Sequence, residues 1–222
     1  MELTAPDIAA KSRPGQFVNL YTGDNAALLP RPISICRADN GLLTLVYKVV
    51  GRGTELFSRL GNGALIRVMG PLGNGFDLLP GPAVLVGGGV GIPPLLGLAK
   101  ALMAADGTRD MSVYLGYRGN ETFLKSDFDE ICGSVCVATE DARGDVLDLI
   151  APTNGNIYAC GPRPMLKALA KRQSPAHTFL SLEERMACGT GVCTGCAVMT
   201  TGGYRRVCRD GPVFGAAELV WE

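Results

Sequence analysis

The chain has 222 residues, 47% of them hydrophobic, and a formal net charge of zero. The balanced charge and the lack of basic runs argue against nucleic-acid binding, and no apolar stretch reaches the ~20 residues of a membrane-spanning helix. With no targeting segment recognised, we expect a cytoplasmic protein without membrane association, whose cysteines are reduced unless they bind metal.

Residues 1–80 contain short β-rich runs separated by turn signals. The runs cover residues 16–21, 33–36, 42–50 and 64–72, and they predict an N-terminal antiparallel β-barrel, domain 1–80. One short helix is expected at residues 54–60, with the Thr54 hydroxyl as its N-terminal cap.

Two clusters in this barrel suggest cofactor binding. Arg31 precedes Pro32, which favours an extended backbone, and we expect the side chains of Arg31 and Ser34 to share one face of a strand. Arginine binds a pyrophosphate through two donors, and serine can bond a ring or ribitol atom. The second cluster, residues 51–54, places Gly53 and Thr54 at a helix start that suits an anion. Each cluster alone is also compatible with an ordinary strand start or a capped turn.

Residues 81–183 predict an α/β domain with a doubly wound parallel sheet. A buried strand at residues 83–87 leads into the glycine loop GGGVG and a helix that starts with two prolines. Further strands are expected at residues 111–118, 134–140, 156–161 and 177–183, and helices at residues 121–131, 146–151 and 162–172.

The carboxyl ends of these strands are the expected nucleotide site. Ligands bind parallel sheets at that edge, and the loop glycines allow close approach of a dinucleotide although they depart from the G-x-G-x-x-G pattern. Arg118 is the only arginine near the end of the second strand, which favours NAD over NADP. The expected NAD-binding residues are Gly88, Gly89, Gly91, Cys160 and Gly161.

The C-terminal segment, residues 184–222, carries four cysteines in the spacing C-x4-C-x2-C-x11-C: Cys188, Cys193, Cys196 and Cys208. The first three follow the plant-type spacing of [2Fe–2S] ligands, and the intervening glycines permit the sharp turns that three converging thiolates require. A zinc site and a disulfide framework are the alternatives. Zinc ribbons usually contain two C-x2-C pairs, and disulfide frameworks suit secreted chains, so a [2Fe–2S] subdomain is favoured.

Several of these motifs together resemble the ferredoxin–NADP reductase superfamily. RPIS resembles its flavin motif, GGGVGIPPLL its nucleotide loop and CGPRPML its motif near the nicotinamide. The strings SLEERMACGTGVCTGCAV and RRVCRDGPVF, with PGQFV and GTELFSRL, most closely resemble electron-transfer subunits of type B dihydroorotate dehydrogenase. This resemblance covers essentially the whole chain.

The resemblance implies cofactors and a partner. It assigns FAD to Arg31, Pro32, Ile33 and Ser34, together with Val46, Tyr47, Lys48, Gly53 and Thr54, and the cluster to the four C-terminal cysteines. It also implies an FMN-containing catalytic subunit that oxidises dihydroorotate in pyrimidine biosynthesis, in a heterotetramer of two plus two chains. Electrons would pass from FMN through [2Fe–2S] and FAD to NAD⁺.

Two further interpretations remain open at this point. The chain layout also fits the flavin and iron–sulfur subunit of another NAD(P)H:ferredoxin-type oxidoreductase, of the transhydrogenase or sulfhydrogenase kind. A regulatory zinc module without flavin is the non-enzyme alternative. Because only thirteen residues precede Pro14, the barrel has either one strand fewer than is usual in the superfamily or a start that lies upstream.

Overall fold

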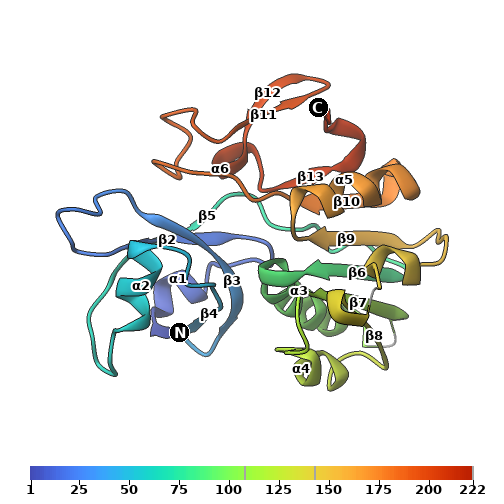
Figure 1. The fold of residues 1–222 in the computed structure, drawn as a ribbon, viewed down its shortest axis with the longest axis horizontal. Helices are drawn as coiled ribbons and strands as arrows, with labels where there is room; N and C mark the ends of the chain where they lie inside the picture. Colours follow the sequence, from blue (N-terminus) through green and yellow to red (C-terminus); the bar gives the residue numbers. More distant parts are fainter. Residues whose placement is uncertain (108, 143, 222) are drawn as a thin grey trace.

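The computed structural model describes residues 1–107, 109–142 and 144–221. The chain forms a curled antiparallel sheet, an α/β part built on a second sheet, and a C-terminal segment that lies along one side of both (Figure 1).

The N-terminal sheet has five antiparallel strands in the order β1-β4-β3-β2-β5. Apolar side chains that alternate along β2 and β4, such as Val18, Leu20, Leu43 and Leu45, fill its core together with Phe57. The pairings of the described residues leave β1 and β5 as edges, so the sheet is open rather than a closed barrel. The strands are β1 (Glu2–Thr4), β2 (Phe17–Tyr21), β3 (Arg31–Asp39), β4 (Leu42–Leu45) and β5 (Arg67–Leu72).

Two short helices, α1 (Pro6–Ala9) and α2 (Arg52–Ser58), accompany this sheet. The helix expected at residues 54–60 is α2, but it begins two residues earlier, with Gly51 as its N-cap. The predicted cap was therefore wrong. The Thr54 hydroxyl lies inside the first turn, where it accepts the N–H groups of Val50 and Gly51 at 3.0 and 3.3 Å.

The second sheet has six strands in the order β13-β10-β9-β6-β7-β8, all parallel except β13. The predicted parallel sheet is confirmed. Its middle strand β6 is buried along its whole length, because apolar layers cover both faces of the sheet. The strands are β6 (Ala83–Gly88), β7 (Met111–Tyr117), β8 (Ser134–Thr139), β9 (Asn156–Cys160), β10 (Thr178–Ser181) and β13 (Val213–Gly215).

Helix α3 (Ile92–Ala105) covers one face of this sheet and α5 (Arg163–Arg172) the other. Both follow the sequence expectation. The helix expected at residues 121–131 is confined to α4 (Lys125–Asp129), and the one expected at 146–151 is the 3-10 turn η3 (Val146–Leu149). The remaining 3-10 turns are η1 (Gly89–Gly91), η2 (Glu140–Ala142), η4 (Pro175–His177) and η5 (Ala216–Glu218). None of the described helices is both long and apolar enough to cross a bilayer.

The C-terminal segment forms the hairpin β11 (Ala197–Thr200) and β12 (Gly203–Arg206), the short helix α6 (Val207–Asp210) and then β13. Strand β13 pairs antiparallel with β10 and so belongs to the second sheet. The sequence analysis did not predict this strand. Phe214 in β13 is buried in the same core as Cys196 and Cys208, which anchors the cysteine segment on the sheet.

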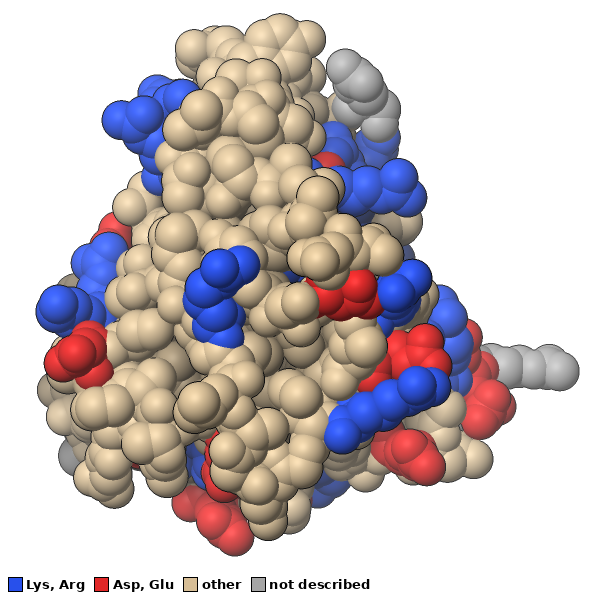
Figure 2. Space-filling model, turned by 90° about the vertical axis from the view of Figure 1, so that its left-hand side faces the viewer, with Lys and Arg blue, Asp and Glu red and all other residues tan. Residues whose placement is uncertain are grey.

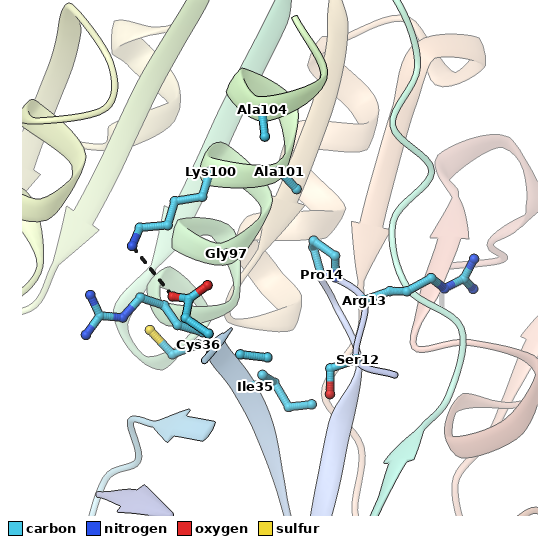
Figure 3. A pocket seen from close by; sticks show the side chains of 12 residues that line it. Ser12, Arg13, Pro14, Ile35, Cys36, Gly97, Lys100, Ala101 and Ala104 are labelled. Carbon is cyan, nitrogen blue, oxygen red and sulfur yellow. Dashed lines mark ion pairs between the residues drawn. The ribbon is translucent and has the colours of Figure 1, made fainter. Parts of the chain in front are cut away.

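The N-terminal sheet and the α/β part meet where helix α3 packs against strand β3. A Cβ at Gly97 would lie 2.6 Å from the carbonyl oxygen of Cys36, so helix and strand approach as closely as a glycine allows. A cleft of about 270 Å³ opens beside this contact, and Lys100 reaches Asp39 across it at 3.8 Å (Figure 3). This contact fixes the N-terminal sheet against the helix that follows the glycine loop.

Candidate functional site

The structure brings Arg31 and Gly53 together. The Arg31 side chain lies directly over Gly53, where a Cβ would be 2.3 Å from the Arg31 Nε atom. An Arg31 Nη1 atom also donates to the carbonyl of Leu29. Two of the predicted FAD residues, which lie 22 positions apart, are therefore in direct contact.

Arg31 and Ser34 do not share a face of their strand, contrary to the expectation. In the register of β3 with β2, Arg31 is opposite Leu20 and Ser34 is opposite Phe17. Residues three positions apart on a regular strand point to opposite faces. Ser34 instead shares its face with Pro32, while Arg31 shares a face with Ile33.

The predicted run Val46, Tyr47 and Lys48 follows β4 as irregular chain. The Tyr47 ring packs edge-on against Phe57 of α2, with the ring centroids 6.3 Å apart, and burial raises the pKa of the Tyr47 hydroxyl. This contact holds the run beside α2 and therefore near Gly53 and Thr54.

The predicted NAD residues converge at the carboxyl edge of the second sheet. A Cβ at Gly91 would lie 2.4 Å from the carbonyl carbon and oxygen of Cys160, and one at Gly161 would lie 3.0 Å from the Gly88 nitrogen. The edge lies between β6 and β9, where the strand order changes direction, and such a switch point is where open α/β sheets bind ligands. Gly89, with a φ of +52°, has no atom within 4 Å of its Cβ position.

Cys160 is buried at the centre of this edge, with 1% of its surface exposed. Burial and, to a smaller extent, the charge of Glu183 raise the pKa of its thiol to about 12. Cys160 therefore remains a neutral thiol at physiological pH, beside the place where the sequence analysis expected the nicotinamide.

The four C-terminal cysteines lie as two pairs. The backbone N–H of Cys193 donates to the Cys188 sulfur at 3.5 Å, and that of Cys208 donates to the Cys196 sulfur at 3.4 Å. Cys196 and Cys208 are each 2% exposed, whereas Cys193 is exposed and Cys188 is half-buried. One pair thus lies near the surface and the other within the core.

The two pairs differ in their electrostatics. The backbone N–H groups of Cys193 and Thr190 lower the pKa of the Cys188 thiol to about 5, whereas burial and the Cys196 thiol raise that of Cys208 to about 12. Amides that point at sulfur are the donors that stabilise thiolate ligands. The set of donors suits a cluster of two irons, each bound by two cysteines.

Among the described residues, no three His, Cys, Asp or Glu side chains are grouped closely enough to hold a single metal ion. All eight cysteines have free thiols. The described cysteines are therefore not joined by disulfides.

The predicted flavin residues and the cysteine segment border a common hollow. It has a volume of about 650 Å³ and is lined by residues 25–32, which include Arg31 and Pro32, and by residues 184–186. Residues 184–186 lead directly into Cys188. The sequence analysis missed Asn19, whose Nδ2 atom donates to the Cys188 carbonyl at 3.0 Å. An asparagine within the apolar run QFVNLY was the signal for it.

Comparison with known proteins places the chain in a family. The model of the iron-sulfur cluster binding domain of dihydroorotate dehydrogenase B matches residues 183–220. The dihydroorotate dehydrogenase B (NAD(+)) electron transfer subunit of Bacillus caldolyticus is 42% identical to this chain, over 94% of this chain and 87% of its own length. The one from Geobacillus thermodenitrificans is 41% identical, over 99% and 91%. The chain belongs to this family of electron transfer subunits.

Solved structures confirm the fold of this electron transfer subunit. The structure described as an NADH-dependent reduced ferredoxin-NADP oxidoreductase, in work on flavin-based electron bifurcation, has a TM-score of 0.85 and 30% identity, and the match covers 99% of this chain and 84% of that one. Phthalate dioxygenase reductase has a TM-score of 0.63 at 17% identity, over 90% and 81%, which is a likeness of fold.

Proposed function

We propose that this electron transfer subunit passes electrons from the FMN of a dihydroorotate dehydrogenase catalytic subunit, through a [2Fe–2S] cluster and FAD, to NAD⁺ in pyrimidine biosynthesis. The observation that carries the proposal is that one chain contains three separate preformed groups of the predicted residues: the Arg31–Gly53 contact, the glycine edge at Cys160 and the two cysteine pairs. A flavin links the one-electron chemistry of a cluster to the two-electron chemistry of nicotinamide. The iron-sulfur domain model spans Cys188, Cys193, Cys196 and Cys208, which supports the cluster assignment. The other four cysteines form no disulfide, which fits the expected cytoplasmic location.

The chain's own residues serve binding and placement. Arg31 holds the FAD pyrophosphate, because its guanidinium is backed by the Leu29 carbonyl and by the bare Gly53 backbone. Pro32, Ile33 and Ser34, with Val46, Tyr47, Lys48 and Thr54, complete that site. Gly88, Gly91 and Gly161 let the loops at the sheet edge pack closely, and Gly89, which has open space around it, leaves room for NAD. The neutral Cys160 thiol adds no charge at this edge.

In this proposal the catalytic subunit docks on the face that carries the loop of residues 188–196, called the cysteine loop below. Loops 22–30 and 59–66 and the cysteine loop extend toward this side (Figure 1), and few charged side chains lie across the centre of the face (Figure 2). These loops expose Leu28, Leu29, Leu65 and Val192 at 76%, 56%, 99% and 81%. Exposed apolar side chains on a face with few charges are typical of an interface. A heterotetramer of two such pairs follows the family expectation.

The test is to co-express the chain with the catalytic subunit and purify the complex. We expect a flavin and iron–sulfur absorption spectrum, two irons per chain from the cluster assignment, and dihydroorotate-dependent reduction of NAD⁺ in preference to NADP⁺. A colourless protein that contains zinc would reject the proposal.

A second candidate function is that of the flavin and iron–sulfur subunit of another NAD(P)H:ferredoxin-type oxidoreductase. It is supported by the solved NADH-dependent reduced ferredoxin-NADP oxidoreductase, whose match covers nearly the whole chain. The dihydroorotate dehydrogenase relatives are more similar, at 42% against 30% identity. Co-purification with a ferredoxin-reducing subunit, and no stimulation by dihydroorotate, would favour this second function.

A further inference from the structure

Two asparagines, Asn19 in strand β2 and Asn74 just after strand β5, donate to the backbone at the two ends of the cysteine segment. The Nδ2 atom of Asn19 donates to the carbonyl oxygen of Cys188 at 3.0 Å. The Nδ2 atom of Asn74 donates to the carbonyl oxygens of Arg209 and Asp210 at 3.2 and 3.3 Å. Arg209 directly follows Cys208. The backbone at the first of the four cysteines is therefore tied to strand β2, and the backbone after the last one is tied to the chain that follows β5.

Packing alone does not explain Asn19. Its side chain is 0% exposed, between Val18 and Leu20 in strand β2, and its Oδ1 atom has no hydrogen-bond partner among the residues that the structure describes. A buried polar atom without a partner is costly, and an apolar side chain of the same size would avoid that cost. The carboxamide is thus maintained for the single bond that it makes, to the Cys188 carbonyl.

The cysteine loop is shaped to receive this carboxamide. Gly189 has a φ of +68°, and a Cβ on it would lie 2.3 Å from the Asn19 Nδ2 atom and 2.9 Å from Oδ1. Any side chain at position 189 would displace Asn19. The glycine next to the first cysteine is therefore needed both for the turn and for the contact with the sheet.

Asn19 also connects the cysteine loop to the proposed flavin strand. In the register of β2 with β3, Asn19 is opposite Pro32, and directly opposed residues project from the same face. The hydrogen bond of Asn19 thus ties Cys188 to strand β2, which pairs directly with the strand of Arg31–Ser34.

From these contacts we infer that Asn19 is a positioning residue for electron transfer, which sets the placement of the Cys188 end of the cluster relative to the flavin strand. Asn74, which is exposed, fixes the Cys208 end in the same way and with a smaller share. This inference rests on the proposed function, since it concerns the distance between the two groups that the proposed sites hold.

The test compares Asn19→Leu, Asn19→His and the control Asn156→Leu in the purified complex. Asn156 is a matched control because it is also buried and donates to a backbone carbonyl, that of Pro80 at 2.9 Å, at the start of β9. Stopped-flow absorbance separates reduction of FAD by NADH from the following reduction of the cluster. Hydrogen exchange of residues 186–192 gives a readout that is independent of activity.

For Asn19→Leu we expect cluster reduction to slow about tenfold or more, as is typical when a residue that orients a ligand is removed, with FAD reduction unchanged and faster exchange at residues 186–192. Asn19→His, whose ring N–H donates at a similar reach, should restore both. Asn156→Leu should leave both unchanged.

Cluster reduction within about twofold of wild type in a fully loaded Asn19→Leu complex would overturn the inference. If Asn19→Leu loses its iron, Asn19→Ser takes its place with the same criterion. Loss of iron from both, with normal FAD content and FAD reduction, supports the inference because Cys188 has then lost its placement. A wild-type complex without FAD or iron would instead reject the proposed function.

Discussion

The carboxyl edge of the second sheet, where we propose that NAD binds (residues 88–91 and 160–161, called the nucleotide edge below), and the cysteine segment are both rich in glycine. The two regions depend on glycine in different ways. At the nucleotide edge, a Cβ on Gly91 would meet the backbone of Cys160, within one sheet. In the cysteine segment, a Cβ on Gly189 or Gly191 would meet the side chains of Asn19 and Arg209. The first region is fixed by packing against backbone within its own sheet. The second is fixed by side chains, of which Asn19 comes from strand β2 and Arg209 from the segment itself. The two regions should therefore fail independently.

The largest effect that separates the two regions is expected for Cys193→Ser. Cys193 is exposed and belongs to the outer cysteine pair, so the change should abolish the cluster absorbance with little loss of stability. Reduction of FAD by NADH should stay largely intact, since the nucleotide edge lies elsewhere. Cys136→Ser is the control for loss of a half-exposed thiol outside the segment. An unchanged cluster spectrum in Cys193→Ser would refute the ligand assignment.

The reverse separation is expected for Gly91→Ala. The new methyl group would overlap the backbone at Cys160 and Gly161, where no flexible side chain can yield. Overpacking of this kind typically costs about 1–3 kcal/mol of unfolding free energy. We expect slower reduction of FAD by NADH and an unchanged cluster spectrum. Urea unfolding measures the expected loss of stability. Gly119→Ala, at a position with open space around it, should change neither; equal behaviour of the two variants would contradict the prediction.

The meeting of Gly91, Cys160 and Gly161 at one edge of the second sheet could be predicted from the sequence because its signals are local. The apolar run of β6, the glycines after it and the prolines of α3 are contiguous, and strand alternation predicts which strand ends meet. The same holds for the cysteine spacing, which lies within one segment.

The missed features depend on contacts between distant residues. Strand β13 is three residues long and pairs only because β10 presents a free edge. Asn19 contacts a loop 169 positions away. The error on Arg31 and Ser34 is of a different kind, because it is local. Residues three positions apart on a strand point to opposite faces, so the sequence alone was enough to place them correctly.

A smaller effect is expected at the proposed flavin site from Gly53→Ala. The methyl group would occupy the place of the Arg31 guanidinium stem, since its Cβ would lie 2.3 Å from Nε. Loss of a hydrogen bond to a charged group costs roughly 1.5–3 kcal/mol, which corresponds to about tenfold or more in FAD affinity. Flavin fluorescence titration of the deflavinated chain measures it. Gly51→Ala, with nothing within 4 Å of its Cβ, is the control. Equal FAD affinities of the two variants would show that the placement of Arg31 does not depend on Gly53.

The smallest effect is expected from charge at the surface, for Asp24→Asn beside the same site. The backbone N–H of Ala26 and then the Arg52 guanidinium, which lies 2.6 Å away, lower the pKa of Asp24 from its ordinary value of 3.8. Since the folded pKa is the lower one, the stabilisation is present above the ordinary value and is lost as the pH falls through the folded pKa.

The Asp24→Asn variant keeps an oxygen that accepts from Ala26 but removes the charge. The difference in Tm between wild type and Asp24→Asn should therefore be small at about pH 7 and should decrease as the pH falls below the ordinary value of 3.8. The difference in Tm should also decrease in about 1 M salt. In a double-mutant cycle, Asp24→Asn should have no further effect on Tm when Arg52 has already been changed to Gln. A difference that persists at low pH would mean that Asp24 acts through its shape rather than its charge, as the glycines of the nucleotide edge do.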